Sequence, residues 1–205
     1  MVYRDSFHKT LEDYPRPSVA VDTAVLTVPP GGELAVVIVS NRLPGTFIHP
    51  GERLSDAVLR SLREKAGIEG LRPRQLLVFD DPDRDPRGWV ISVAHADAIP
   101  TRRLNPNRSH YLLPVARLDK LDYAHNEIVE LAVAELRADY VAAPDPAQLL
   151  EEPFTLRELH TLHEAVAGEP LQRDTFRRAM VPMLAATGER STGSMGKPAE
   201  LYRRG

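Results

Sequence analysis

The sequence predicts an α/β domain with a mixed sheet, followed by a smaller domain of two helices and a β-hairpin. Three observations lead to this prediction. Runs of β-branched residues alternate with two stretches of helical periodicity up to residue 141. A proline-rich segment interrupts this pattern at residues 142–153. Two amphipathic stretches and a glycine-rich, basic segment then follow.

The first domain is expected to contain several strands and two helices. Residues 18–41 read as two strands around the turn PPGGE, because valines dominate on both sides of it. A helix is expected over about 53–66, stopped by Gly67, with an apolar stripe of Leu54, Ala57, Val58, Leu62 and Ala66. Strand-like runs follow at 74–79, 89–95 and 110–116. A second helix is expected over about 125–140, with one side formed by Ile128, Leu131, Ala132 and Leu136.

The second domain begins with a capping box, in which Thr155 precedes Glu158 by three residues at the start of FTLRELHTLHEAVAG. Gly168 is expected to end this helix. The next helix spans about 173–183, and its spacing suits burial of Phe176, Ala179, Met180 and Met183. A strand, a basic tip and a second strand are expected after it. Helix, turn, helix and hairpin in this order predict a winged helix-turn-helix domain.

These patterns divide the chain into a first domain at 1–145, a linker at 146–153 and a second domain at 154–205. The charge is distributed unevenly between them. The formal net charge is −3, but residues 171–205 carry +4 and the rest of the chain carries −7. A basic end is typical of nucleic-acid binding, and a solvated basic surface is the alternative.

The composition excludes several classes of protein. The chain of 205 residues has no cysteine, which excludes a disulfide framework and a thiolate metal site. The first residues lack the apolar core of a signal peptide, and no apolar run approaches the ~20 residues of a membrane span. We therefore expect a cytoplasmic protein with no membrane partner.

Residues 46–68 resemble the Nudix box, G-x5-E-x7-R-E-U-x-E-E-x-G-U, in which U is a bulky aliphatic residue. The sequence aligns without gaps and matches at Glu52, Arg60, Leu62, Glu64, Gly67 and Ile68. It departs at three positions, where the motif's opening glycine and two of its glutamates are replaced by Thr46, Ser61 and Lys65. The resemblance implies a Nudix-like α/β/α sandwich with a mixed sheet.

The two lost glutamates bear on the chemistry that the resemblance implies. Nudix enzymes cleave a diphosphate with a divalent metal held by clustered carboxylates, and Mg²⁺ requires hard oxygen ligands. Positions 61, 64 and 65 are expected to share a helix face, where Lys65 opposes a metal electrostatically. We predict no catalytic residue, no metal ligand and no cofactor. Two alternatives remain, an active hydrolase with other ligands and a surface helix carrying an Arg60–Glu64 ion pair.

A nucleotide bound without cleavage is expected to contact the degenerate box and one loop. Lys65 would hold the diphosphate, or pair with Glu52 or Glu64. In the loop RDPRG, arginines can bind a diphosphate bidentately, although a solvated turn is the alternative. Phe47 and Trp89 would stack on a base or belong to the core. The predicted ligand-binding residues are Thr46, Glu52, Arg60, Glu64, Lys65, Arg84 and Arg87.

From about residue 18 to 203 the chain resembles the Nudix-related transcriptional regulators of NAD metabolism. The resemblance rests on the degenerate box followed by FTLRELHTLHEAVAGEPLQRDTFRRAM and GKPAELYR, and LPGTF…LRSLREKAGI is similar to the actinobacterial type. It implies a dimeric repressor of NAD synthesis or salvage genes. Such repressors bind ADP-ribose, or a related NAD-derived nucleotide, in the Nudix-like domain and a double-stranded operator through winged helices.

The resemblance makes RDTFRRAM the recognition helix and the basic tip the wing. Arginine pairs bidentately with guanine in the major groove, and Thr and Lys suit phosphate. The DNA-binding residues that it implies are Arg173, Thr175, Arg177, Arg178, Arg190, Ser191, Thr192 and Lys197. A solvated helix face is the alternative for each arginine.

Two other functions remain open. One is a metal-dependent ADP-ribose or ADP-sugar pyrophosphatase, and the other is a constitutive DNA-binding protein whose first domain only dimerises. The histidines indicate no metal site, because no HExxH motif is present. His160 and His163 are expected on a helix surface, and His125 is expected to cap or pack at a helix start.

Overall fold

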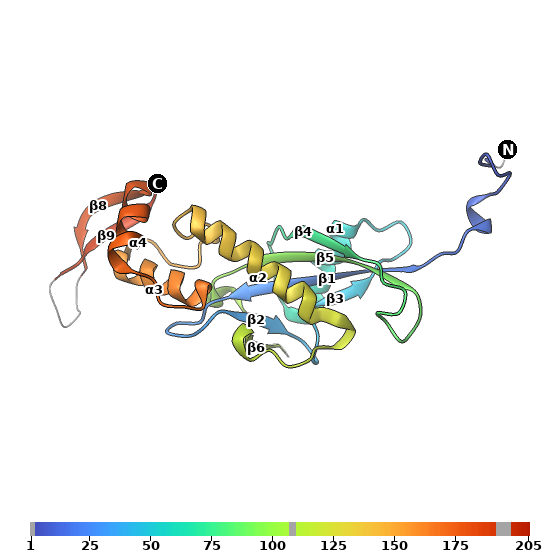
Figure 1. The fold of residues 1–205 in the computed structure, drawn as a ribbon, viewed down its shortest axis with the longest axis horizontal. Helices are drawn as coiled ribbons and strands as arrows, with labels where there is room; N and C mark the ends of the chain where they lie inside the picture. The colour runs from blue at the N-terminus through green and yellow to red at the C-terminus, as the bar shows by residue number, and fades with distance from the viewer. Residues whose placement is uncertain (1–2, 107–109, 192–197) are drawn as a thin grey trace.

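The computed structural model describes residues 3–106, 110–191 and 198–205. The two termini lie at opposite ends of an elongated molecule (Figure 1). The strands are β1 (Ser18–Thr27), β2 (Ala35–Ile38), β3 (Gly45–Phe47), β4 (Arg74–Phe79), β5 (Val90–Ala98), β6 (Tyr111–Pro114), β7 (Phe154–Thr155), β8 (Leu184–Arg190) and β9 (Glu200–Arg204). The α-helices are α1 (Leu54–Ser61), α2 (His125–Ala142), α3 (Leu156–Ala167) and α4 (Arg173–Met180). Short helical turns lie at Leu11–Asp13, Thr101–Arg103, Val115–Arg117, Asp122–Ala124 and Val181–Met183.

The first domain contains the mixed sheet that the sequence predicts. Its strand order is β4-β5-β1-β2-β6, and β3 pairs with β1 beside β2. β1 and β5 run parallel, whereas the remaining pairs are antiparallel. β3 was not predicted from the sequence, because a strand of three residues is too short to show alternation.

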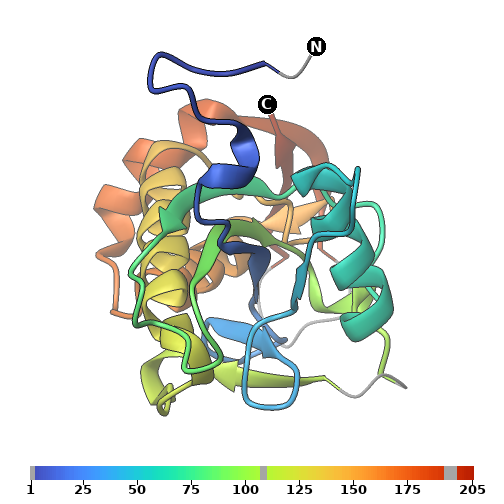
Figure 2. The same ribbon diagram turned by 90° about the vertical axis from the view of Figure 1, so that its right-hand side faces the viewer.

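Helices cover both faces of the sheet, which confirms the α/β/α sandwich. Alternate residues of a strand point to opposite faces. Val21 and Val25 of β1 therefore pack with α1, whereas Ala24 and Leu26 pack with α2. Figures 1 and 2 show α2 running along the sheet on the side opposite α1. Within the described residues, we find no helix that is long and apolar enough to cross a membrane.

The box helix is not a regular α-helix to its end. α1 continues into a π-helical turn, Leu62–Ala66, which ends at Gly67 with a φ of 67°. The predicted stripe is confirmed, since Ala57, Val58, Leu62 and Ala66 are all buried. A π-turn adds a residue to the helical repeat and rotates the side chains after it, and such turns are frequent at functional sites.

The second domain has the predicted winged-helix order. Its three-stranded sheet runs β7-β9-β8, and α3 and α4 precede the hairpin. The capping box is confirmed, because Thr155 and Glu158 hydrogen-bond reciprocally at the start of α3. The small core consists of Phe154, Leu159, Phe176, Met180 and Tyr202.

Three apolar side chains that were expected in the core are exposed. Leu131 lies on the outer side of α2, with 36% of its surface accessible. Ala179 lies on the exposed side of α4, and Met183 is exposed in the short turn that follows because α4 ends at Met180. Pro182 lies in the short turn after α4, and proline is unfavourable for extending an α-helix through this region.

His163 is buried, so its prediction as a surface residue was wrong. Its ring packs edge-on against Tyr140 of α2 and Phe176 of α4, with centroid distances of 4.9 Å in both pairs. Burial lowers the pKa of His163 to about 4, which keeps the imidazole neutral near pH 7. The histidine therefore belongs to the packing between the two domains.

A carboxylate at the junction holds the two domains together. Asp145 is completely buried and accepts hydrogen bonds from the Tyr140 hydroxyl at 2.6 Å and the Leu149 amide at 2.8 Å. It also accepts from the Leu150 amide at 3.0 Å and from Nη2 of Arg204 at 2.8 Å. Arg204 belongs to β9, so the wing sheet is tied to the connection between the domains.

Candidate functional site

A cavity of about 160 Å³ lies at the end of the sheet beside the degenerate box. β1 and β3 form one wall, and the other walls come from the π-turn, the loop at 84–87 and the segment at 123–125. The predicted ligand residues that line this cavity are Thr46, Lys65, Arg84 and Arg87. Among the lining residues that were not predicted as ligand contacts are Arg42, Tyr123 and Asp22.

Positive charge predominates in this cavity. Its lining includes Arg42, Lys65, Arg84 and Arg87, against the carboxylates of Asp22 and Asp85. Nε and Nη2 of Arg87 bind the Asp85 carboxylate at 2.9 and 2.6 Å, which lowers the pKa of Asp85. Arg84 donates from Nη2 to the Tyr123 carbonyl at 2.9 Å. The remaining positive charge suits an anionic ligand such as a diphosphate.

Lys65 enters the cavity from the π-turn. Its ammonium donates to the Gly45 carbonyl, and desolvation lowers its pKa. Within the described residues, no carboxylate forms an ion pair with Lys65 closer than 4.0 Å. The ammonium therefore retains donor capacity for a ligand.

Glu52 and Arg60 of the box form a structural clamp. Nε and Nη2 of Arg60 each lie 2.8 Å from a carboxylate oxygen of Glu52, and Nη2 also donates to the Phe47 carbonyl at 3.0 Å. The hydrogen bonds from Arg60 and from the His49 amide lower the pKa of Glu52 to about 2. The pair fastens β3 to α1 and so fixes the wall of the cavity that carries Thr46.

The residues of the box do not fit a divalent metal. Ser61 is buried, and its hydroxyl has no hydrogen-bond partner within the described residues. The side chain of Glu64 is 55% exposed, and its carboxylate lies 3.7 Å from Arg63 and 3.9 Å from Arg60. The expectation that positions 61, 64 and 65 share one face is therefore wrong for Ser61, because the π-turn separates them. Across the described residues, no three His, Asp or Glu side chains gather as metal ligands would.

A buried histidine–carboxylate pair, His125 and Asp22, lines the cavity. His125 and Asp22 approach at 3.3 Å between Nε2 and Oδ1, and Ser92 donates to the other Asp22 oxygen at 2.5 Å. The Leu43 amide donates to Nδ1 of His125 at 3.0 Å, which places the imidazole proton on Nε2. Burial alone would raise the pKa of Asp22, but the contacts with His125 and Ser92 lower it.

This hydrogen-bonded pair joins the cavity to the start of α2. Tyr123 and Ala124, which precede the helix, both have left-handed backbone conformations, with φ of 59° and 58°. Non-glycine residues in this region are strained and cluster at functional sites. The only sequence signal for Asp22 is a lone acid within the apolar run SVAVDTAVLT.

Two aromatic rings lie at the mouth of the cavity. The guanidinium of Arg87 stacks 4.3 Å from the ring centroid of Tyr123 and 5.3 Å from that of Phe47. Phe47 is 39% exposed and lines the cavity, so its ring is available for a second flat group. Trp89 is also exposed but does not line the cavity.

A second candidate site lies at the other end of the molecule, where α4 and the β8–β9 hairpin are neighbours (Figure 1). On α4 the predicted DNA-binding residues are exposed, namely Arg173, Thr175, Arg177 and Arg178. Arg190 at the end of β8 is also exposed. Ser191 closes the hairpin, because its hydroxyl accepts from the Ala199 amide at 3.0 Å. Thr192 and Lys197 lie outside the described residues.

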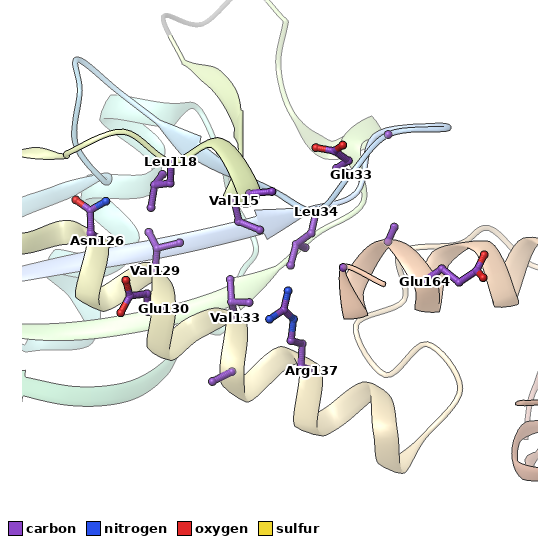
Figure 3. A pocket seen from close by; sticks show the side chains of 15 residues that line it. Glu33, Leu34, Val115, Leu118, Asn126, Val129, Glu130, Val133, Arg137 and Glu164 are labelled. Atoms are coloured by element: carbon purple, nitrogen blue, oxygen red, sulfur yellow. The ribbon is translucent and has the colours of Figure 1, made fainter. Parts of the chain in front are cut away.

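A groove of about 660 Å³ separates the two domains on one side (Figure 3). One wall is α2, and the turn before β2, the segment at 115–118 and the end of α3 form the others. Arg137 crosses it from α2 and donates from Nε to the Val166 carbonyl of α3 at 3.0 Å. α2 thus reaches from the charged cavity, at His125, to the second domain, at Arg137 and Tyr140.

Comparisons with known proteins agree with the fold of both domains. Residues 146–204 match the family model described as the NrtR DNA-binding winged helix domain. The chain is 29% identical, over 93% of its length and 83% of the relative's, to the ADPR responsive transcriptional repressor NtrR of Acinetobacter baylyi.

Two solved structures extend this comparison. Shewanella oneidensis NrtR complexed with a 27mer DNA is 30% identical, with a TM-score of 0.75 over 91% of this chain and 93% of that chain. The NUDIX domain of the same protein complexed with ADP ribose has a TM-score of 0.54 at 24% identity, over 63% of this chain and 95% of that chain.

Proposed function

The chain belongs to the NrtR family, and from this premise we propose that it is an ADP-ribose-responsive transcriptional repressor. Its winged helix binds operator DNA, and its Nudix-like domain binds ADP-ribose or a related NAD-derived nucleotide. The repressor is a homodimer of the actinobacterial type that acts in the cytoplasm on genes of NAD synthesis or salvage. One observation carries the proposal: the chain combines a cationic cavity in a degenerate Nudix box with an exposed row of arginines on α4.

In the proposed nucleotide site the diphosphate lies among Lys65, Arg84 and Arg87, and the adenine stacks near Phe47. Thr46 contributes a hydroxyl, and Glu52, Arg60 and Glu64 hold the box in shape. The support is the excess of cations in the cavity and the guanidinium that already stacks at its mouth. Charge-assisted hydrogen bonds to phosphate are about twice as strong as neutral ones.

The proposed repressor is not a hydrolase. The alternative is a metal-dependent ADP-ribose or ADP-sugar pyrophosphatase, which requires carboxylates where this chain has Ser61 and Lys65. ADP-ribose incubated with Mg²⁺ or Mn²⁺ and a high concentration of the protein is expected to stay intact. Release of AMP that disappears in Glu64→Gln would favour the pyrophosphatase.

In the proposed mechanism, the domains 1–145 and 154–205 change their relative position through the connection at 146–153. A ligand shifts such an equilibrium only if it binds one arrangement better than the other. α2 is the element that can transmit the difference, because it contacts the nucleotide cavity at one end and α3 at the other. The groove beside Arg137 leaves room for α3 to move (Figure 3).

A gel-shift experiment tests the proposal directly. Promoter fragments of NAD synthesis and salvage genes are incubated with the protein, with and without ADP-ribose. We expect a sequence-specific shift whose midpoint changes with the nucleotide. The absence of a specific shift would contradict the proposal. A shift that ignores ADP-ribose, with no heat of nucleotide binding in calorimetry, would instead favour the constitutive DNA-binding protein.

Replacing Lys65 with alanine is expected to weaken ADP-ribose binding by about 10- to 150-fold, because one charge-assisted hydrogen bond contributes about 1.5–3 kcal/mol. Lys65→Glu should weaken binding further, since it places a negative charge beside the diphosphate. Calorimetric titration with ADP-ribose measures both. Arg63→Ala is the matched control, because this exposed neighbour on the π-turn does not line the cavity. Unchanged affinity in both Lys65 variants would remove Lys65 from the site.

A further inference from the structure

An amino-terminal arm, residues 3–14, projects from the end of the sheet that lies farthest from the second domain (Figure 1). Its large apolar side chains are exposed to solvent: Tyr3 by 84%, Phe7 by 76% and Leu11 by 81%. None of the arm residues belongs to a hydrophobic cluster of the described chain. A group of exposed large apolar side chains is characteristic of an interaction surface.

The arm nevertheless has a defined local structure. The Asp5 carboxylate accepts from the Phe7 amide at 2.8 Å and the Lys9 amide at 3.0 Å, and the Tyr14 hydroxyl donates to the same carboxylate. Thr10 and Asp13 form a capping box, and prolines at 15 and 17 restrict the backbone between the arm and β1. An arm that is ordered before it docks loses less conformational entropy on docking.

The sheet has an uncovered apolar strip near the start of β1. The register pairs Val19 with Ile91 and Val78 with Val93, which places these side chains on the α1 side of the sheet. α1 covers the middle of this face, but Val78 remains 42% exposed. Leu77 and Trp89 beside it are 52% and 44% exposed.

The strip also includes the edge of the sheet. β4 is the terminal strand of the sheet order, and its register shifts between Gln75 and Val78. Within the described residues, no strand pairs with its outer side. Unpaired edge strands with apolar side chains are sites at which another chain adds on.

We propose that the arm of one copy packs on the strip of a second copy, so that two copies exchange their arms around a two-fold axis. The inference rests on the proposed homodimer and assigns the surface that forms it. Each copy carries both complementary surfaces, as a closed two-fold exchange requires. The arm projects away from its own sheet (Figure 1), so a second copy is the partner that covers both surfaces.

The area involved suits a stable dimer. Tyr3 and Phe7 each bury about 150–250 Å² when covered. Two arms and the two strips beneath them therefore remove roughly 1,600 Å² from water, which is the size of a standard stable interface. A single arm folded back on its own copy would bury about half as much and would leave no contact between copies.

The test compares the oligomeric state of the full chain with that of Phe7→Asp/Leu11→Asp by sedimentation velocity. We expect a dimer for the unmodified chain and a dissociation constant at least 100-fold higher for the variant, because four buried apolar side chains are lost per dimer. Val78→Asp in the strip should also raise the dissociation constant. Glu12→Gln is the control, because it changes an exposed residue of the arm and leaves the apolar surface of the arm unchanged. The dissociation constant of this variant should equal that of the unmodified chain.

Cross-linking decides which copy an arm contacts. The natural chain has no cysteine, so introduced thiols react only with each other. Leu11→Cys and Leu77→Cys proteins are mixed and oxidised, and we expect a disulfide-linked heterodimer. The double variant Leu11→Cys/Leu77→Cys should also link between chains, and a link within one chain would overturn the exchange.

The outcomes distinguish failure of the proposed arm exchange from failure of the proposed homodimer. A dimer that persists in Phe7→Asp/Leu11→Asp and in Val78→Asp overturns the arm exchange and leaves the proposed homodimer intact. A full chain that is monomeric at micromolar concentration overturns both. The gel shift with ADP-ribose is read separately, so the repressor function can fail or hold independently of the arm.

Discussion

Replacing Asp145 with alanine is expected to lower the free energy of unfolding by about 3–5 kcal/mol. The carboxylate is completely buried and accepts hydrogen bonds from the Tyr140 hydroxyl, two amides and Arg204. Its removal leaves these donors unsatisfied, and each buried donor without a partner costs about 1–3 kcal/mol. Burial and the adjacent carboxylate raise the pKa of Tyr140, so its hydroxyl stays protonated and acts as a donor.

Urea unfolding at neutral pH measures this loss. Asp145→Asn keeps the side-chain volume, but it replaces one accepting oxygen with an NH₂ group that faces other donors. We therefore expect Asp145→Asn to recover less than half of the stability that Asp145→Ala loses. Asp139→Ala is the matched control on the preceding helix α2, because its ion pair with Arg74 is exposed and contributes less than about 1 kcal/mol. If Asp145→Ala lost no more stability than Asp139→Ala, the junction would not depend on this carboxylate.

The same carboxylate explains why the end of the chain was difficult to predict. Arg203 and Arg204 belong to the basic end at 171–205, which the sequence alone relates to nucleic-acid binding or to a solvated surface. In the structure Arg204 turns away from solvent to Asp145, Glu152 and the Leu150 carbonyl. The sequence separation between residues 145 and 204 hides this contact, since no periodic pattern links them.

The regular elements could be predicted because burial of one face imposes a period on the sequence. Val21 and Val25 alternate with Ala24 and Leu26, and the 53–66 stripe follows the helical repeat. The π-turn could not be predicted, because one extra residue in a helical turn leaves the apolar pattern almost unchanged. Ser61 precedes the π-turn and is buried, whereas Lys65 lies within the turn and is directed to the cavity.

Only part of the candidate nucleotide site could be predicted, because only some of its residues lie in segments with a recognisable sequence pattern. The box and the loop at 84–87 carry recognisable residue types, and the structure brings Lys65, Arg84 and Arg87 together. Arg42 and Tyr123 are missing from the prediction because they lie in irregular segments with left-handed residues, at 40–41 before Arg42 and at 123–124 before α2. Ordinary residue types in an irregular loop give no signal in one sequence.

The double substitution Arg177→Ala/Arg178→Ala is expected to reduce operator affinity about 30-fold or more. Both arginines are exposed on α4, whose other side buries Phe176 and Met180, so the helix itself should remain folded. An arginine that reads a guanine contributes about 1–3 kcal/mol, and one that binds phosphate contributes a salt-dependent share. Fluorescence anisotropy with the promoter duplex that the unmodified protein shifts measures the change.

The salt dependence of binding then assigns each arginine a role. Loss of a phosphate contact lowers the slope of log K against log salt by about one, and weakens binding to operator and scrambled duplexes alike. Loss of a base contact leaves the slope unchanged and affects the operator alone. Arg157→Ala, an exposed arginine at the start of α3, serves as the control for net charge. If this control weakened operator binding as much as the double substitution, α4 would be a solvated basic face and not the recognition helix.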